Sequence, residues 1–228
     1  MIPSTHKQIK DTDMDATGDP GWMKDYWKDQ DVFILGSGAS LTDFDLNRLN
    51  GKNVIACAHM VNFFPAQFCV FLDVSVLHGL NKSPGPWGRF HSIVSQGVSG
   101  KSYGHRPGRY VTSISTKAKH AQRKGVQLDP HGAIYSGFSS GYVATNIALI
   151  MGAKKIYLLG HDCCAVNGKT HCYDVMKVKG EVPSSVTSEY ADFKHGWKAF
   201  DKWKHMIYNL SAPSQIETFD KMDVNKVI

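Results

Sequence analysis

No stretch of the 228-residue chain approaches the roughly 20 consecutive apolar residues that a membrane-spanning helix needs. The longest apolar run, 142–151, is interrupted by Thr145 and Asn146. Residues 1–20 are polar and acidic and lack the apolar core of a secretory signal peptide, so we expect a cytoplasmic protein without a transmembrane segment. Apolar residues make up 42% and charged residues 20%, a balance that excludes a disordered chain.

Cysteine is too scarce and too irregularly spaced for a disulfide framework. The five cysteines are an odd number, and Cys57 and Cys69 lie in apolar, strand-like runs where reduced, buried thiols are expected. No C-x₂-C pair occurs, and the adjacent Cys163 and Cys164 are poor partners for a single tetrahedral ion. A zinc site is therefore the less favoured interpretation, and we predict no metal ligand set.

Acidic residues are absent between Asp73 and Asp129, although this interval holds nine lysines and arginines and four histidines. Residues 1–45, by contrast, hold nine aspartates and only four lysines. A positively charged surface attracts anions, so we expect an anionic partner for this interval, either a saccharide or a nucleic acid. Arg106 and Arg109 are the candidate acceptor-binding residues. A solvated loop without a ligand explains the same composition.

Hydrophobic periodicity predicts an α/β fold with alternating strands and helices. Buried parallel strands are expected at 31–35, 53–57, 68–72 and 155–159, with weaker candidates at 92–95, 110–114 and 216–219. Helices are expected at 42–49 after a Thr42 cap, at 139–151 before Gly152, and at 188–210, with a shorter one at 21–30 that docks its aromatic rings.

These elements predict a Rossmann-like, mostly parallel sheet flanked by helices. Residues 1–20 form a flexible arm in this prediction, and residues 21–228 form a single nucleotide-binding domain. A lid-like insertion is expected at about 81–130, because residues 97–108 hold four glycines and a proline.

The strongest candidate for a binding loop is Gly36-Ser37-Gly38-Ala39-Ser40, which follows a strand. Glycines permit a tight turn and close approach of a ligand, and backbone amides at the start of a helix favour an anion. The loop lacks the third glycine of the dinucleotide fingerprint, and no GK[ST] follows it, so neither a Rossmann dehydrogenase nor a P-loop is indicated. A merely structural turn is the alternative.

Three further features add candidate site residues. Ser139-Ser140-Gly141 opens a helix with two hydroxyls and several free amides. The segment 160–164 ends a strand, where ligands of open α/β sheets bind, and it contains Asp162. His195 lies off the apolar stripe of the last helix and suits general base catalysis, although such a histidine is usually just solvated.

Three blocks of the chain, FILGSGASLTDFDLNRL, SSGYVATNIALIMGAKKIYLLGHD and NGKTHCYD, together resemble the bacterial sialyltransferases of glycosyltransferase family 42. They also resemble the MptE-like proteins, which include archaeal 6-hydroxymethyl-dihydropterin diphosphokinases. The blocks cover about half the chain. The sialyltransferase resemblance implies that a CMP-sugar is held by two segments, which supply Gly36, Ser37, Gly38, Ser40, Ser139, Ser140 and Gly141.

The same resemblance implies that His195 removes the proton of the acceptor hydroxyl in an inverting displacement without a metal. This chain departs from the family at the two tyrosines that stabilise the leaving phosphate, where Cys164 and His171 stand instead. His171 can still donate a hydrogen bond to phosphate. Family asparagines of the nucleotide crevice are replaced as well, and Asp73 stands at one of these positions.

Three functions therefore remain open from the sequence. The first is a glycosyltransferase-like enzyme with a CMP-type nucleotide-sugar donor and no cofactor. The second is an MptE-like diphosphokinase, in which Asp73 and Asp162 would hold Mg²⁺ for ATP. The third is a nucleotide- or polyanion-binding protein without catalysis, with nucleic acid as one polyanion. A homo-oligomer is compatible with each.

Overall fold

Seven parallel strands form one sheet in the computed structural model. The structure describes residues 20–72, 91–95, 110–114, 116–117, 126, 128, 134–135, 139–173 and 190–228. The strand order is β5-β4-β3-β2-β1-β8-β9, and each neighbouring pair is parallel. The strands are β1 (Asp31–Leu35), β2 (Asn53–Cys57), β3 (Phe68–Phe71), β4 (His91–Ser95), β5 (Tyr110–Ile114), β8 (Lys155–Leu159) and β9 (Ile207–Asn209). Two further short strands, β6 (Thr116–Lys117) and β7 (Ile134–Tyr135), pair with each other.

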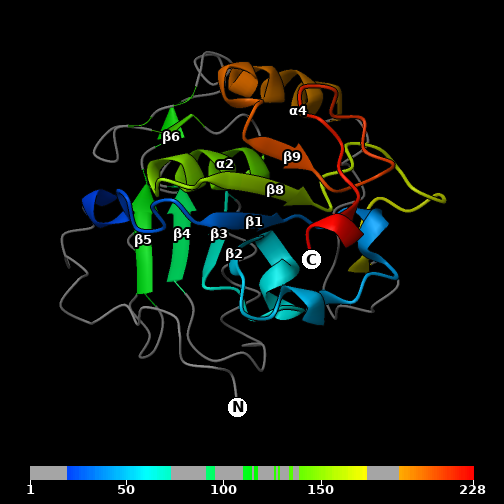
Figure 1. Cartoon of the computed structure of the whole chain (residues 1–228), viewed down its shortest axis with the longest axis horizontal. Coiled ribbons are helices and arrows are strands. Elements are labelled where there is room, and N and C mark those ends of the chain that lie inside the picture. The colour runs from blue at the N-terminus through cyan, green and yellow to red at the C-terminus, as the bar shows by residue number, and fades with distance from the viewer. Residues whose placement is uncertain are drawn as a thin grey trace.

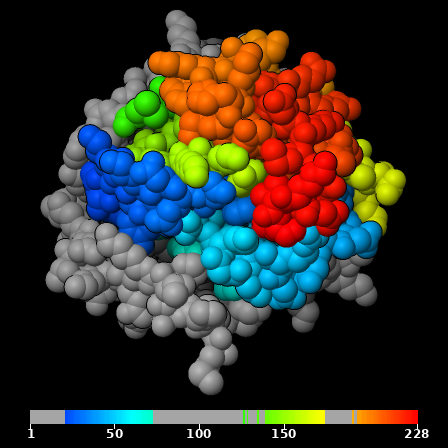
Figure 2. Space-filling model, in the orientation of Figure 1, coloured from blue at the N-terminus to red at the C-terminus, as the bar shows by residue number. Residues whose placement is uncertain are grey.

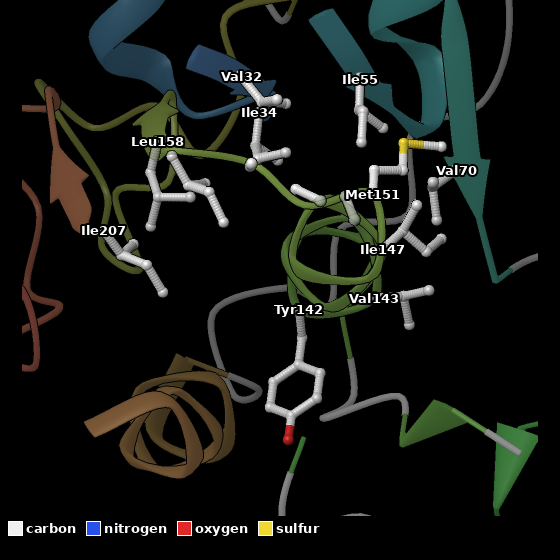
Figure 3. Close-up of a cluster of buried hydrophobic side chains, with 14 of the residues drawn as sticks. Val32, Ile34, Ile55, Val70, Tyr142, Val143, Ile147, Met151, Leu158 and Ile207 are labelled. Carbon is white, nitrogen blue, oxygen red and sulfur yellow. The ribbon is translucent and has the colours of Figure 1, made fainter. Parts of the chain in front are cut away.

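One face of the sheet is covered by α2 (Ser140–Ile150), α4 (Tyr190–Trp197) and the 3₁₀ helix η8 (Lys198–Trp203) (Figure 1). The α2 side chains are almost all buried, because this helix lies between the sheet and the α4–η8 segment. Figure 3 shows Val143 and Ile147 of α2, and Met151 directly after it, among β-branched side chains of the sheet, while Tyr142 points away from the sheet. The Tyr142 ring meets Phe200 of η8 with centroids 4.6 Å apart.

The opposite face of the sheet carries no α-helix among the described residues. It is covered by the 3₁₀ helices η3 (Ala39–Leu41), η4 (Leu46–Leu49) and η5 (Ala58–Asn62) and by the C-terminal residues, which include η9 (Val224–Lys226). Figure 2 shows the C-terminal residues in red beside the light-blue residues that follow β1. A hydrogen bond from the Arg48 guanidinium to the Ile228 carbonyl joins these two segments.

The first described residues supply hydrogen-bond donors to the C-terminal end of α2. The 3₁₀ helix η2 (Pro20–Met23) leads into a turn whose Asp25, Trp27 and Asp29 amides donate to the carbonyls of residues 150–152, over 2.8–3.1 Å. These are carbonyls that the end of a helix leaves without partners. The expected docking of aromatic rings is confirmed, since Trp22, Tyr26 and Trp27 all pack on Phe68, although the segment forms a 3₁₀ helix and turns rather than an α-helix.

The two longer helices predicted at 42–49 and 188–210 are not formed as expected. Residues 42–49 do not form one helix: Thr42 ends η3 through a bond from its hydroxyl to the Ala39 carbonyl, and Asp45 caps η4 by accepting from the Asn47 amide. Short polar side chains that bond to the nearby backbone compete with a continuing helix. The helix predicted over 188–210 ends early, because Ile207–Asn209 pairs with β8 as the edge strand.

The predicted strand at 216–219 is also absent among the described elements, although Ile216 and Phe219 are buried in the core on the α2 side. The fold class itself is confirmed: the chain has a Rossmann-like parallel sheet with flanking helices. No described helix combines the length and apolarity that crossing a bilayer requires. The arm at 1–20 and most of the insertion at about 81–130 lie outside the described residues and stay predictions.

Candidate functional site

The strand order predicts that a ligand would bind beyond the carboxyl ends of β1 and β8. From β1 the chain adds β2, β3, β4 and β5 on one side, and then returns to add β8 and β9 on the other. Ligands of open α/β sheets bind beyond the carboxyl ends of the strands at such a reversal. The turn at 36–40 follows β1 and the turn at 160–162 follows β8, so both lie at this point. In Figure 1 the arrowheads of β8 and β9 point toward this edge of the sheet.

The β1 and β8 turns lie so close together that no side chain fits at Gly36, Gly38 or Gly160. A Cβ on Gly36 would lie 2.5 Å from the Gly160 carbonyl oxygen, and one on Gly38 would lie 2.5 Å from Oδ2 of Asp162. Gly160 itself has a φ of +66°, in the left-handed region that favours glycine. No ligand is needed to explain why these positions lack side chains.

The amides of the same loop are partly occupied. Those of Gly36 and Gly38 donate to the carbonyls of residues 159 and 160, at 2.7 and 2.8 Å, and that of Ser40 donates to Asp162 at 2.8 Å. These three amides are not free for an anion, which corrects the sequence interpretation of the loop. The first turn of α2, which contacts the same His161 ring as Gly36, offers further donors for an anion.

Asp162 ties the two turns together. Its side chain is 2% exposed, and its two oxygens accept from the Ser40 amide (2.8 Å) and the Ser40 hydroxyl (2.6 Å). Hydrogen bonds to an ionised carboxylate are the stronger kind. The sequence offered Asp162 as a catalytic residue or a Mg²⁺ ligand, and the geometry gives it a positioning role between the β1 and β8 turns.

We expect Ser40→Ala to lower the free energy of unfolding by about 1–2 kcal/mol, because it leaves one buried oxygen of Asp162 without a donor. Urea unfolding monitored by fluorescence measures this change. Ser37→Ala in the same loop is the matched control and should stay within about 0.5 kcal/mol of the wild type. Equal destabilisation by both variants would show that the Ser40–Asp162 contact is unimportant.

His161 lies between the two glycine-containing segments. Its ring is adjacent to Gly141 in the first turn of α2 and to Gly36, and the Trp197 ring packs edge-on against it with centroids 5.7 Å apart. Burial lowers the pKa of His161 to about 4, while the Ile34 backbone acts in the opposite direction. The ring is therefore neutral at physiological pH, and it brings the β1 turn and the start of α2 together.

A loop after β9 holds the β8 turn in place. The Ser211 hydroxyl accepts from the Gly160 amide at 2.7 Å, and the Ser214 hydroxyl donates to the His161 carbonyl at 2.7 Å. The amide of Gln215 donates to the Asp162 carbonyl at 2.8 Å. Ser211 and Ser214 are 3–4% exposed, so these bonds are buried. The backbone around His161 is thus fixed from the C-terminal side.

The start of α2 has the features expected from the sequence. Ser139 is the N-cap, and its hydroxyl accepts from the Tyr142 amide at 3.1 Å. Ser140 and Gly141 open the helix, and the first amides of a helix have no acceptor within it. The positive end of the helix dipole adds to their preference for an anion. A Cβ on Gly141 would lie 2.4 Å from the His161 ring, so the start of α2 lies directly against the β8 turn.

His171 reaches the site through the backbone. It forms an isolated antiparallel bridge with Gly38, and the Cys172 amide donates to the Ser37 carbonyl at 2.9 Å. The His171 ring stacks on Tyr173 at 4.8 Å, and Tyr173 stacks in turn on Phe63 at 6.2 Å. The structure therefore places His171 beside the glycine loop, as a donor to a ligand there would require.

The structure does not place His195, the predicted general base, at the β1 turn or the β8 turn. It is exposed on α4, and within the described residues no hydrogen bond or ring contact joins it to either turn. Its helix does reach the site: Trp197 contacts His161, and the Lys194 ammonium bonds to Gln215 at 3.0 Å. Three predicted site residues, Asp73, Arg106 and Arg109, lie outside the described residues.

The five cysteines do not gather at a common site. All five are free thiols; Cys57, Cys69 and Cys172 are buried, which confirms the interpretation of the first two. The Cys172 thiol contacts the sulfur of Met60 at 3.7 Å, while the Cys164 thiol bonds to the Pro213 carbonyl. Within the described part of the chain, no group of three or more metal-binding side chains occurs.

The sequence placed the segment 160–164 at the site but singled out only Asp162 in it, and it gave no role there to Trp197 or to the Ser211–Ser214 loop. One signal for His161 was present: a histidine between Gly160 and Asp162, directly after a buried strand. The contacts of Trp197 and of the serines come from segments about 35–55 residues further along the chain, so only the folded structure shows them.

Comparison with known proteins finds solved structures with a similar fold. No family model and no curated protein sequence matches this chain. The fold is similar to that of the MAf glycosyltransferase from Magnetospirillum magneticum AMB-1, with a TM-score of 0.59 and 16% identity over 88% of this chain and 35% of that one. The chain thus spans about a third of the length of that protein. This likeness shows a shared fold and assigns the chain to no family.

Two structures of the sialyltransferase CstII from Campylobacter jejuni also match. The complex with the substrate analogue CMP-3FNeuAc has a TM-score of 0.46 and 13% identity over 85% of this chain and 86% of that one. The complex with cytidine-5'-monophosphate has a TM-score of 0.46 and 14% identity over 86% and 85%.

Proposed function

We propose that this protein is a glycosyltransferase that takes a nucleotide-activated, CMP-type sugar donor and transfers the sugar to an acceptor hydroxyl. The observation that carries the proposal is the meeting of the β1 turn, the β8 turn and the start of α2 at the reversal in strand order. The similarity of the fold to that of the MAf glycosyltransferase supports it. So do the sequence blocks that resemble family 42, since they supply these same three segments.

In the proposed reaction the acceptor oxygen attacks the anomeric carbon of the donor. The bond between that carbon and the phosphate oxygen breaks, and the nucleotide leaves with the electron pair. Negative charge therefore grows on the phosphate, where donors that are already oriented give the largest stabilisation. The first amides of α2 at Ser140 and Gly141 and the His171 imidazole are the proposed donors, with Ser37 and Asp73 contacting the nucleotide.

The acceptor proton goes to His195 in this proposal, because an imidazole is the usual base near neutral pH. Since His195 is exposed on α4, the acceptor would approach from the solvent side of that helix. Arg106 and Arg109 are proposed to bind an anionic acceptor. The reaction as written needs no metal, and Asp162 is left to its contact with Ser40.

Thermal shift with CMP, CDP, UDP and ATP, each with and without Mg²⁺, tests the proposal. We expect stabilisation by the cytidine nucleotides without Mg²⁺, because binding to the folded state alone raises the melting temperature. Stabilisation by ATP alone, and only with Mg²⁺, would instead support the diphosphokinase interpretation and contradict the transferase.

We expect His195→Ala to lower kcat by about 10²–10⁴-fold, the usual contribution of a general base, while the Kd for CMP changes less than about twofold. The measurement is nucleotide release from the CMP-sugar and acceptor pair on which the wild type turns over, with calorimetry for CMP binding. His205→Ala is the matched control, because His205 is also exposed and lies beyond η8. Undiminished turnover in His195→Ala would remove His195 from this role.

A further inference from the structure

Two Asn-Gly pairs, Asn50-Gly51 and Asn167-Gly168, lie in exposed turns of the described chain. In such a pair the glycine amide nitrogen can attack the side-chain carbonyl carbon of the asparagine. A glycine has no side chain to hinder this attack, and a Cβ built on either of these glycines would meet no atom within 4 Å. Neither glycine amide donates to a backbone carbonyl among the described residues. Both pairs therefore present an accessible nucleophile.

The Asn167-Gly168 pair forms the tip of a two-residue hairpin. Val166 and Lys169 pair through two backbone hydrogen bonds of 2.9 and 3.0 Å, and the two tip residues have φ angles of +51° and +74°. Left-handed backbone at both tip positions is the geometry of a tight hairpin turn, and asparagine and glycine are the residues that adopt it most easily. The requirements of the turn thus place an Asn-Gly pair here.

This hairpin directly precedes the residues that pair with the glycine loop at 36–40. His171 forms an antiparallel bridge with Gly38, and the Cys172 amide donates to the Ser37 carbonyl at 2.9 Å. One residue separates the hairpin from His171. A change in backbone length at the hairpin tip would therefore displace the residues that contact the glycine loop.

We propose that Asn167 is a site of spontaneous covalent modification, and that the modified protein has an altered ligand site. The Gly168 nitrogen forms a bond to Cγ of Asn167, the bond from Cγ to Nδ2 breaks, and ammonia leaves with the proton of the Gly168 amide. Water then opens the resulting succinimide ring at one of its two carbonyls. One product is aspartate. The other is isoaspartate, in which the main chain runs through the side-chain carbons and is longer by one carbon.

The folded hairpin slows this reaction without preventing it. The attack requires a rotation of the Asn167 backbone, which breaks the pairing of Val166 with Lys169. That pairing consists of two hydrogen bonds at an exposed tip, and such a tip opens locally while the sheet stays folded. We therefore expect the modification in the native protein, at a lower rate than in an unstructured peptide of the same sequence.

Isoaspartate changes the ligand site in two ways. The longer main chain does not fit the two-residue turn, so His171 and Cys172 lose their positions against the glycine loop. The new carboxylate also adds a negative charge close to His171, a proposed donor to the phosphate, and like charges repel. The loss of nucleotide affinity rests on the proposed function, whereas the modification and the displacement of the glycine loop do not.

Asn50-Gly51 is a matched control within the same chain. Its turn is closed by a bond of 3.0 Å from the Lys52 amide to the Leu49 carbonyl, and it precedes β2. The turn therefore lies at the amino edge of the parallel sheet, whereas the glycine loop follows β1 at the carboxyl edge. Modification of Asn50 adds the same charge and the same extra carbon, but it should leave the ligand site unchanged.

Two variants allow each site to react alone. In Asn50→Gln only Asn167 is followed by a reactive glycine, and in Asn167→Gly only Asn50 is. Glycine adopts left-handed backbone without strain, so Asn167→Gly should keep the hairpin. Both variants and the wild type are incubated at pH 7 and pH 9, and isoaspartate is located by peptide mapping and enzymatic methylation. We expect it at position 167 in Asn50→Gln, and faster at pH 9, because the attacking amide must lose its proton.

Modified and unmodified proteins differ in charge and are separated by ion exchange. In modified Asn50→Gln we expect the backbone amide resonances of Ser37, Gly38 and Cys172 to shift, while in modified Asn167→Gly they should not. Isothermal titration of CMP should give an affinity about 10-fold or more lower for modified than for fresh Asn50→Gln, the loss of one hydrogen bond to a charged group. Modified and fresh Asn167→Gly should bind CMP equally.

The remaining outcomes separate the modification from the proposed function. Absence of isoaspartate at position 167, or glycine-loop resonances that stay unmoved in modified Asn50→Gln, would overturn the proposal. Equal CMP affinity of modified and fresh Asn50→Gln would also overturn it and leave the proposed function intact. If the resonances shift but fresh protein does not bind CMP, the proposed function is wrong and the modification site stands.

Discussion

Gly141→Ala is expected to destabilise the protein by about 2–3 kcal/mol, the upper part of the range for overpacking a filled interior. The added Cβ would lie 2.4 Å from Cε1 and 2.7 Å from Nδ1 of His161, well inside van der Waals contact. The ring has little room to retreat, because Gly36 and Trp197 lie on its other sides. In an unobstructed helix the same change usually stabilises the protein by about 0.5–1 kcal/mol. A loss of stability in Gly141→Ala would therefore indicate the clash with His161.

A double-mutant cycle with His161→Ala isolates the contact. Once the imidazole is gone, the nearest atom to the new Cβ is on Trp197 at 3.5 Å, an ordinary contact, so Gly141→Ala should become neutral or slightly stabilising. Gly36→Ala is the matched control. Its Cβ would lie 2.5 Å from the Gly160 backbone oxygen as well as 2.9 Å from His161, so removing the ring should not rescue it.

Urea unfolding of the single and double variants measures both cycles. We expect a coupling of about 2–3 kcal/mol between residues 141 and 161, and a much smaller one between residues 36 and 161. An additive result for Gly141 and His161 would mean that the start of α2 does not rest on the imidazole. The basis for placing α2 at the crevice would then be lost.

Local signals were sufficient for the elements around the crevice. The limits of α2 and β8 follow from a serine cap, an apolar run and Gly152, whose φ of +76° ends the helix as glycine commonly does. The burial patterns of β1, β2 and β8 are nearly continuous, as expected for parallel strands covered on both faces. These features depend on residues close together in the chain.

Features that depend on distant partners were not predictable. Residues 207–209 continue the apolar stripe of a helix, yet they become an edge strand because β8 offers them a backbone to pair with. The Ser40–Asp162 contact spans 122 residues, so the sequence could present Asp162 only as a carboxylate at a strand end. Likewise the role of the glycines was assigned to a ligand, when the approach of one turn to another already requires them.

The stability of the wild type should fall by about 3 kcal/mol through His161 alone when the pH is lowered from 7 to 4. Burial holds the pKa of this imidazole at about 4 in the folded protein, whereas it returns to 6.5 in the unfolded chain. Between these values the unfolded state binds the proton and the folded state does not, so stability is lost as the pH falls through 6.5 toward 4. Below about pH 4 both states are protonated and the loss levels off.

Chemical unfolding of the wild type and His161→Phe at several pH values from 4 to 7 isolates this effect. Carboxylates and the other histidines titrate in both proteins, so their contributions cancel in the difference between the two curves. That difference should be flat near pH 7 and should change by about 3 kcal/mol by pH 4, in the direction of a relatively more stable variant at acid pH. Parallel curves would mean that the imidazole is solvated in the folded state, and a solvated ring would not fill the space between the β1 turn and the first turn of α2.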